Sequence, residues 1–118
     1  MQSGMPSLFE DGGDDTPERL LPDGRFAPYY QDEAVTLYHG RCEAVMAQLV
    51  EGSAAMVLAD LPYATTKNGW DRPVEFKLLW HHLHRLCPER ATVVLFGTGL
   101  FSAKTIMSNP SEYRYSLV

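Results

Sequence analysis

The sequence has few of the features that mark several common protein classes. It contains only two cysteines, Cys42 and Cys87, with no Cys-x-x-Cys spacing, which argues against a disulfide framework or a structural zinc site. It has no run of about 18 apolar residues, and its N-terminus lacks a basic segment followed by an apolar one, so neither a membrane span nor a secretory signal is expected. We therefore expect an intracellular, cytoplasmic protein whose two thiols are reduced and buried.

Charge and size set further limits. The chain has 118 residues and a formal net charge of -5, so we expect one domain at most, and the acidic balance argues weakly against a nucleic-acid partner. Much of the negative charge lies in the N-terminal stretch, at Glu10, Asp11, Asp14 and Asp15. From residue 64 onward the chain is slightly basic, so DNA stays compatible with the composition.

The pattern of apolar residues predicts the organisation of the chain. Residues 1–31 are rich in Gly, Pro, Asp and Ser without periodicity, and we expect a flexible lead-in there, followed by one domain over residues 32–118. Strands are predicted at 34–38, 54–59, 91–96 and 113–118, and helices at 43–50, 74–86 and 100–107. The run at 54–59 is continuously apolar, which favours a strand buried on both faces. This order predicts α/β architecture, a parallel sheet flanked by helices.

The tetrapeptide Asp60-Leu61-Pro62-Tyr63 directly follows the strand predicted at 54–59. Ligands bind such sheets at the carboxyl ends of the strands. The Asp60 carboxylate and the Leu61 carbonyl can each accept one N–H of an exocyclic amine, which prepares its nitrogen to attack a methyl group. Pro62 fixes the backbone beside that carbonyl, and Tyr63 offers an aromatic face to an extruded base. A simple strand-ending turn is the alternative, because Asp and Pro are routine there.

This tetrapeptide resembles the Asp-Pro-Pro-Tyr motif of N6-adenine and N4-cytosine DNA methyltransferases, with Leu61 at the usual first Pro. Residues 30–71 resemble the catalytic-motif region of the subgroup in which this motif precedes the cofactor-binding Gly motif, and residues 91–118 continue the similarity. The resemblance implies a partial Rossmann-like methyltransferase fold, with S-adenosyl-L-methionine as methyl donor and double-stranded DNA as substrate. Asp60 at the first motif position favours adenine slightly over cytosine.

The resemblance also assigns residues around the motif. It implies cofactor contacts at Asp60, Thr65 and Thr66, and substrate contacts at Tyr63, Lys67 and Trp70. Lys67 would meet a phosphate and Trp70 would shape the base pocket; a solvated loop with Trp70 folded onto the core is an equal alternative.

The chain departs from the family pattern in two places. Gly40-Arg41-Cys42 stands where the family has Gly-Asp-Cys, so a cation replaces an acidic group. The family's Phe-x-Gly-x-Gly cofactor loop is expected only after residue 118. The alternative to an active enzyme is therefore an inactive or split fragment that binds DNA or a complementary C-terminal methyltransferase segment.

Two further patterns carry less weight. The side chains of His81, His82, His84 and Cys87 suggest a metal site, but their helix already has an apolar stripe and we expect no metal there. Gly97-Thr98-Gly99 follows a predicted strand. It lacks the rest of a dinucleotide-binding motif, which favours a tight strand-to-helix turn.

Overall fold

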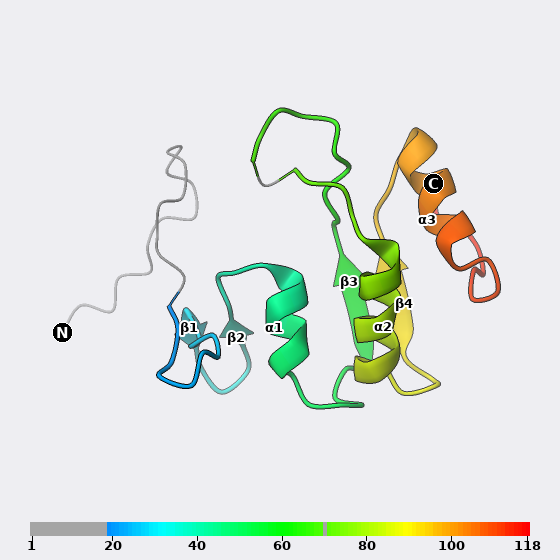
Figure 1. Cartoon of the computed structure of the whole chain (residues 1–118). Helices are drawn as coiled ribbons and strands as arrows, with labels where there is room; N and C mark the ends of the chain where they lie inside the picture. The colour runs from blue at the N-terminus through cyan, green and yellow to red at the C-terminus, as the bar shows by residue number, and fades with distance from the viewer. Residues whose placement is uncertain (1–18, 70) are drawn as a thin grey trace. The chain divides into compact units, whose positions relative to one another are not determined.

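The computed structural model describes residues 19–69 and 71–118, which divide into two compact units on either side of the Gly40–Arg41 bond (Figure 1). The first unit holds β1 (Tyr30–Gln31) and β2 (Thr36–Leu37). The second holds α1 (Cys42–Gln48), β3 (Met56–Ala59), α2 (Phe76–Leu86), β4 (Thr92–Leu95) and α3 (Gly99–Ser108). The first 18 residues of the predicted lead-in lie outside the described residues.

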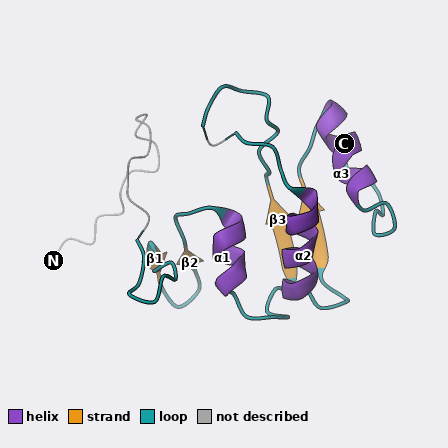
Figure 2. Cartoon of the chain, in the orientation of Figure 1, coloured by secondary structure: helices purple, strands orange, loops and turns teal. Residues whose placement is uncertain are grey.

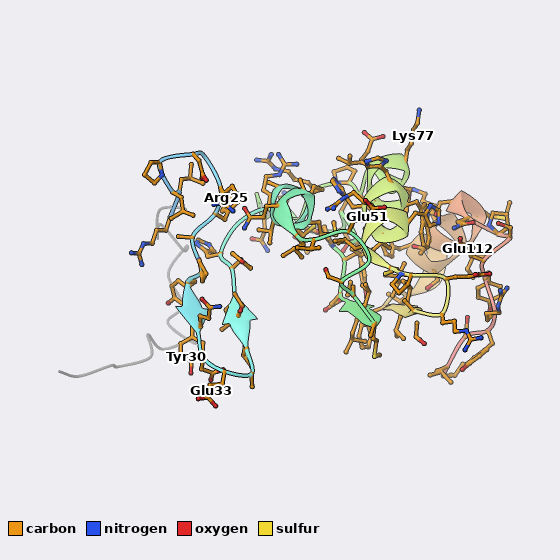
Figure 3. The ribbon with its side chains drawn as sticks, turned by 90° about the horizontal axis from the view of Figure 1, so that it is seen from below. Arg25, Tyr30, Glu33, Glu51, Lys77 and Glu112 are labelled. Carbon is orange, nitrogen blue, oxygen red and sulfur yellow. The ribbon has the colours of Figure 1, made fainter. Side chains whose placement is uncertain are left out.

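The first unit is built around a small hairpin. β1 and β2 are antiparallel, with Tyr30 opposite Leu37, and the side chain of Tyr30 lies near the turn end of the hairpin (Figure 3). The Asp32 carboxylate forms this turn, because its Oδ1 accepts the N–H groups of Ala34 at 2.8 Å and Val35 at 2.7 Å. Its Oδ2 accepts the hydroxyl of Tyr30 at 2.7 Å. Turn and strand therefore stabilise each other locally.

This hairpin corrects one prediction. The segment 34–38 was expected to form the first strand of the parallel sheet, but β2 pairs antiparallel with β1 in a sheet of its own. The expected boundary between lead-in and domain, after residue 31, falls inside the hairpin. The physical reason is the turn at Asp32, whose carboxylate accepts two backbone N–H groups and so returns the chain to the residues that precede it.

The second unit confirms the α/β prediction in its coarse form. β3 and β4 pair in parallel from Met56 opposite Thr92 to Ala59 opposite Leu95, and helices flank this small sheet. The strands predicted at 54–59 and 91–96 and all three predicted helices form, each shifted at its ends by no more than a few residues. A parallel pair needs a crossover connection, and here α2 supplies it.

The core of this unit lies between α2 and one face of the sheet. α2 lies over the two strands (Figure 2), and its side chains at Leu79 and Leu83 form a buried cluster with Leu61. The alternate strand residues pack against this cluster, namely Val57, Ala59, Val93 and Leu95. Apolar residues recur every second position along the strands and every third to fourth position along α2, and this is the reason that the helix packs on the sheet.

The opposite face of the sheet corrects a second prediction. β3 is not buried on both faces, because Met56 is 55% exposed and Leu58 is 62% exposed. Within the described residues no element covers that side of β3. Residues 113–118 also form no strand. Apolar residues predict where a strand can form, but a strand needs a neighbour to supply its hydrogen bonds.

Two general expectations were tested as well. None of the helices in residues 19–69 and 71–118 has the length and the apolar character needed to cross a bilayer. Both thiols are free, but Cys42 is exposed and Cys87 is only half-buried, so the prediction of buried thiols was wrong. The reason for Cys42 is that α1 is short and buries none of its side chains.

Candidate functional site

The candidate site lies at the carboxyl end of the parallel sheet. In Figure 1 the loop that follows β3 and the turn that follows β4 leave the sheet at this same end. The backbone N–H of Phe96 donates to the carbonyl of Ala59 at 3.0 Å, which continues the ladder up to the residue before Asp60. The predicted catalytic tetrapeptide and the turn into α3 are therefore neighbours at one sheet edge, as expected for ligand sites in parallel sheets.

Asp60 and Tyr63 face each other across the tetrapeptide. Asp60 is exposed, and its Oδ1 accepts the hydroxyl of Tyr63 at 3.3 Å. Burial raises the pKa of the Tyr63 hydroxyl, and the charge and hydrogen bond of Asp60 raise it further. The carboxylate thus receives one donor at Oδ1, and a carboxylate has two oxygens that can each accept more than one hydrogen bond, so it has capacity for a further donor.

Aromatic packing holds the ring of Tyr63. Its centroid lies 4.7 Å from that of Phe101 with the ring planes at 32°, and Phe101 lies 6.0 Å from Phe76 at the start of α2. Tyr63 is half-buried as a result. One face of the ring therefore rests on Phe101 of α3.

Leu61 and Pro62 fix the backbone between these two side chains. The Leu61 side chain is 8% exposed and packs with Leu79 and Leu83. Pro62 has no N–H and a fixed φ. The tetrapeptide therefore anchors one apolar side chain in the core while the carboxylate beside it stays exposed.

The loop after the tetrapeptide is organised by Asp71. Its Oδ1 accepts the backbone N–H of Ala64 at 2.7 Å, and its Oδ2 accepts those of Thr65 at 2.9 Å and Thr66 at 2.6 Å. Asp71 is only 8% exposed. Burial alone would raise the pKa of its carboxyl, but the hydrogen bonds from the Thr66 side chain and the three backbone groups outweigh burial and lower it. The carboxylate is therefore held ionised.

The predicted loop contacts have different environments. Thr65, Thr66 and Lys67 are exposed. The Thr66 hydroxyl is occupied within the loop, where its oxygen accepts the Asn68 N–H at 3.3 Å, so Thr65 has the freer hydroxyl. Trp70, predicted to shape a base pocket, lies outside the described residues. The structure thus places Asp60 and Tyr63 within hydrogen-bond distance of each other. It holds the N–H groups of residues 64–66 at the Asp71 carboxylate and leaves Lys67 exposed on the same loop.

Two residues of this region were not singled out by the sequence. Phe101 reaches Tyr63 from a helix far along the chain, and no local pattern signals such a contact. Asp71 closes the loop that begins at Ala64. A carboxylate at the end of a polar, Gly-containing loop is a recognisable acceptor for loop N–H groups, so its role had a usable signal.

The two weaker candidates from the sequence are the His residues of α2 and the Gly97-Thr98-Gly99 segment. Among the described residues no group of three or more His, Cys, Asp or Glu side chains is arranged to hold a metal ion. His84 instead pairs with Glu112 at 2.9 Å, and burial lowers the pKa of His82. Gly97 and Thr98 join β4 to α3, whose first residue Gly99 has a φ of 53°. The predicted strand-to-helix turn is therefore confirmed.

Comparison of the chain with protein-family models, with curated proteins and with solved structures gives no match. The residues and their geometry at the sheet edge are therefore the basis on which a function is inferred.

Proposed function

We propose that this chain carries the catalytic edge of an S-adenosylmethionine-dependent methyltransferase that acts on the exocyclic amine of adenine or cytosine in DNA. The observation that carries the proposal is the exposed Asp60 carboxylate at the carboxyl end of a parallel strand, 3.3 Å from the hydroxyl of Tyr63. In this proposal the β3–β4 sheet and its helices are part of a Rossmann-like methyltransferase fold.

The chemistry needs two acceptors and no covalent nucleophile. The lone pair of an exocyclic amine is delocalised into the base, and two acceptors that bind its two N–H groups draw the nitrogen toward a tetrahedral geometry. Asp60 supplies a charged acceptor and Leu61 a backbone carbonyl held by its buried side chain. The methyl carbon would exchange its bond to the donor's sulfur, which keeps the electron pair, for a bond to the amine nitrogen, and the Asp60 carboxylate would accept the proton that the nitrogen must then lose.

The residues at this edge fit the polar end of S-adenosylmethionine, which carries an ammonium and a carboxylate. The Asp60 carboxylate accepts from an ammonium, and the exposed Thr65 hydroxyl donates to a carboxylate. The Thr66 hydroxyl is already engaged by Asn68, so Thr66 contributes through the shape of the loop. When bound, this donor supplies an electrophilic methyl group on a sulfonium.

Exposed cations near the site suit a phosphate backbone. Lys67 lies on the loop, and Arg72 is oriented by a hydrogen bond from its Nε to the Gly69 carbonyl at 2.9 Å. Figure 3 shows Lys77 extending from α2 away from the sheet. Such contacts orient DNA without reading its sequence. Tyr63 then meets the extruded base, with its stacking worth about 1–3 kcal/mol.

A methyl-transfer assay tests the proposal. Labelled S-adenosylmethionine and double-stranded DNA of mixed sequence are incubated with the full chain, with Asp60→Ala and with Glu51→Ala, a matched change at an exposed acid that precedes β3, whereas Asp60 follows it. We expect label in DNA from the unchanged chain and from Glu51→Ala, and loss of at least about a hundredfold in Asp60→Ala. Unchanged transfer in Asp60→Ala refutes the role of this carboxylate.

One observation favours the second candidate, a fragment that binds DNA or a complementary methyltransferase segment without methylating. The outer face of β3 exposes Met56 and Leu58, and Phe96 beyond β4 is 51% exposed. Parallel sheets are normally covered on both faces. DNA binding by the full chain without label transfer, measured in the same samples, would favour this candidate.

A further inference from the structure

The Asp71 carboxylate is an unusual group for an exposed loop. It is nine-tenths buried, while the residues whose N–H groups it accepts, Ala64, Thr65 and Thr66, are all exposed. Its own N–H donates to the Asn68 carbonyl at 3.0 Å, so the loop closes on itself through one residue. Burying a charge is costly unless the group is fully hydrogen-bonded. The loop therefore wraps its backbone donors around this one carboxylate.

Ala64 is the residue that this arrangement constrains most. Its φ is 57°, and it is the sole residue other than Gly with a positive φ among residues 19–69 and 71–118. An L-residue with a Cβ rarely adopts this conformation, and it persists only where the surrounding structure enforces it. The 2.7 Å hydrogen bond from the Ala64 N–H to Asp71 is a restraint of this kind.

We propose that Asp71 is a positioning residue, which holds Ala64 in its left-handed conformation and so sets the direction in which the chain leaves Tyr63. Its role in catalysis rests on the proposed function, because it acts through Asp60 and Tyr63 rather than on a substrate. The left-handed turn directly after Tyr63 limits where the tyrosine hydroxyl can point. It also presents Thr65 at the sheet edge, with the Thr65 N–H bound to Asp71 at 2.9 Å.

The geometric part of the proposal is tested without any enzymatic assay. In the full chain, amide exchange at residues 64–66 and the titration of the Tyr63 hydroxyl are followed by NMR, for the unchanged chain and for Asp71→Asn. Asparagine keeps the size but replaces one acceptor oxygen by an amide donor. We expect exchange at the three amides to rise on the order of tenfold. The Tyr63 pKa should fall toward its usual value as the contact with Asp60 loosens.

Asp32→Asn is the matched control, because Asp32 also accepts backbone N–H groups but belongs to the other unit. It should accelerate exchange at Ala34 and Val35 and leave residues 64–66 and Tyr63 unchanged. If Asp71→Asn is too unstable to study, a pH titration of the unchanged chain replaces it: the amide shifts of residues 64–66 must follow one common carboxyl titration. Independent titrations, or a Tyr63 pKa unaffected by Asp71→Asn, overturn the proposal.

Methyl transfer separates this proposal from the proposed function. If Asp60→Ala abolishes transfer and Asp71→Asn lowers kcat/KM on the order of tenfold with its amides loosened, both stand. If Asp71→Asn transfers methyl as fast as the unchanged chain while Asp60→Ala does not, the positioning role fails and the function stands. If the unchanged chain transfers no methyl, the proposed function fails, and the amide and Tyr63 measurements still decide whether Asp71 positions the loop.

Discussion

Asp32 and Asp71 each organise one loop, in the first and the second unit of this chain respectively, but they do so in different surroundings. Each carboxylate accepts backbone N–H groups of the loop that contains it. Asp32 is exposed and binds residues two and three positions ahead, whereas Asp71 is buried and binds residues five to seven positions behind. The first interaction depends on neighbours in sequence, and the second needs a folded loop above a packed core.

The causes of the lowered pKa also differ between the two carboxyls. The hydroxyl of Tyr30 is the main cause that lowers the pKa of Asp32, and two backbone donors add to it. For Asp71 burial acts in the opposite direction, and only the combined hydrogen bonds from residues 64–66 lower the pKa. The lowered pKa of Asp71 therefore depends on the integrity of the loop, while that of Asp32 depends mainly on the Tyr30 side chain.

The largest expected effect comes from the core beneath the loop. Leu83 is 2% exposed and packs on Leu61, so Leu83→Ala should cost about 2–5 kcal/mol of unfolding free energy in the second unit. Denaturant unfolding measures this loss. Amide exchange should rise at residues 64–66 and stay unchanged at Ala34 and Val35. Faster exchange in both loops would mean that the Asp32 turn also depends on the core of the second unit.

Acid is expected to act on both carboxyls, and the sign follows from their pKa values. Both are lowered in the folded chain. Each therefore stabilises the fold fully above the unfolded carboxyl pKa of about 3.9 and loses this contribution as the pH falls through the lower, folded value. The loop of residues 64–66 should open cooperatively below about pH 4. Amide exchange against pH measures this, and Asp71→Asn should remove the transition at residues 64–66 alone.

Glycine substitutions in the two loops should have opposite signs. Ala64 has a positive φ and Ala34 has not. Ala64→Gly relieves a conformation that costs about 1–2 kcal/mol, less the greater chain entropy of glycine, for a net gain of about 0.5 kcal/mol. Ala34→Gly relieves nothing and should cost about 0.5–1 kcal/mol. Thermal unfolding of both variants gives the comparison, and a loss of stability in Ala64→Gly would contradict the strain assigned to that residue.

The contrast between local and long-range interactions also explains which features the sequence could predict. β3, α2, β4 and α3 follow from local periodicity and from the Gly and Pro residues that end each segment, and so did the position of Asp60 at the end of a strand. The hairpin partner of β2 was missed because the strand pattern at 34–38 says nothing of which segment it pairs with. The exposure of Met56 and Leu58 was missed because the apolar run at 54–59 likewise says nothing of which segments cover the two faces of the strand.

The same distinction between local and long-range contacts applies to the candidate site. The tetrapeptide could be found because its residues are adjacent, and Asp60 and Tyr63 do lie within hydrogen-bond distance of each other. The packing of Phe101 on Tyr63 could not be found, because it joins segments on different elements. Such contacts depend on how α3 lies against the loop, which tertiary packing decides rather than local propensity.

The smallest expected effects come from removing one hydroxyl in each unit. Tyr30→Phe deletes the main cause of the lowered pKa of Asp32, so that pKa should rise toward its usual value. Tyr63→Phe deletes a longer hydrogen bond, 3.3 Å against 2.7 Å, and keeps the ring on Phe101, so thermal unfolding should not change. Carboxyl titration by NMR and thermal melts measure the two outcomes. A marked loss of stability in Tyr63→Phe would mean that the hydroxyl, and not the ring packing, holds Tyr63 beside Asp60.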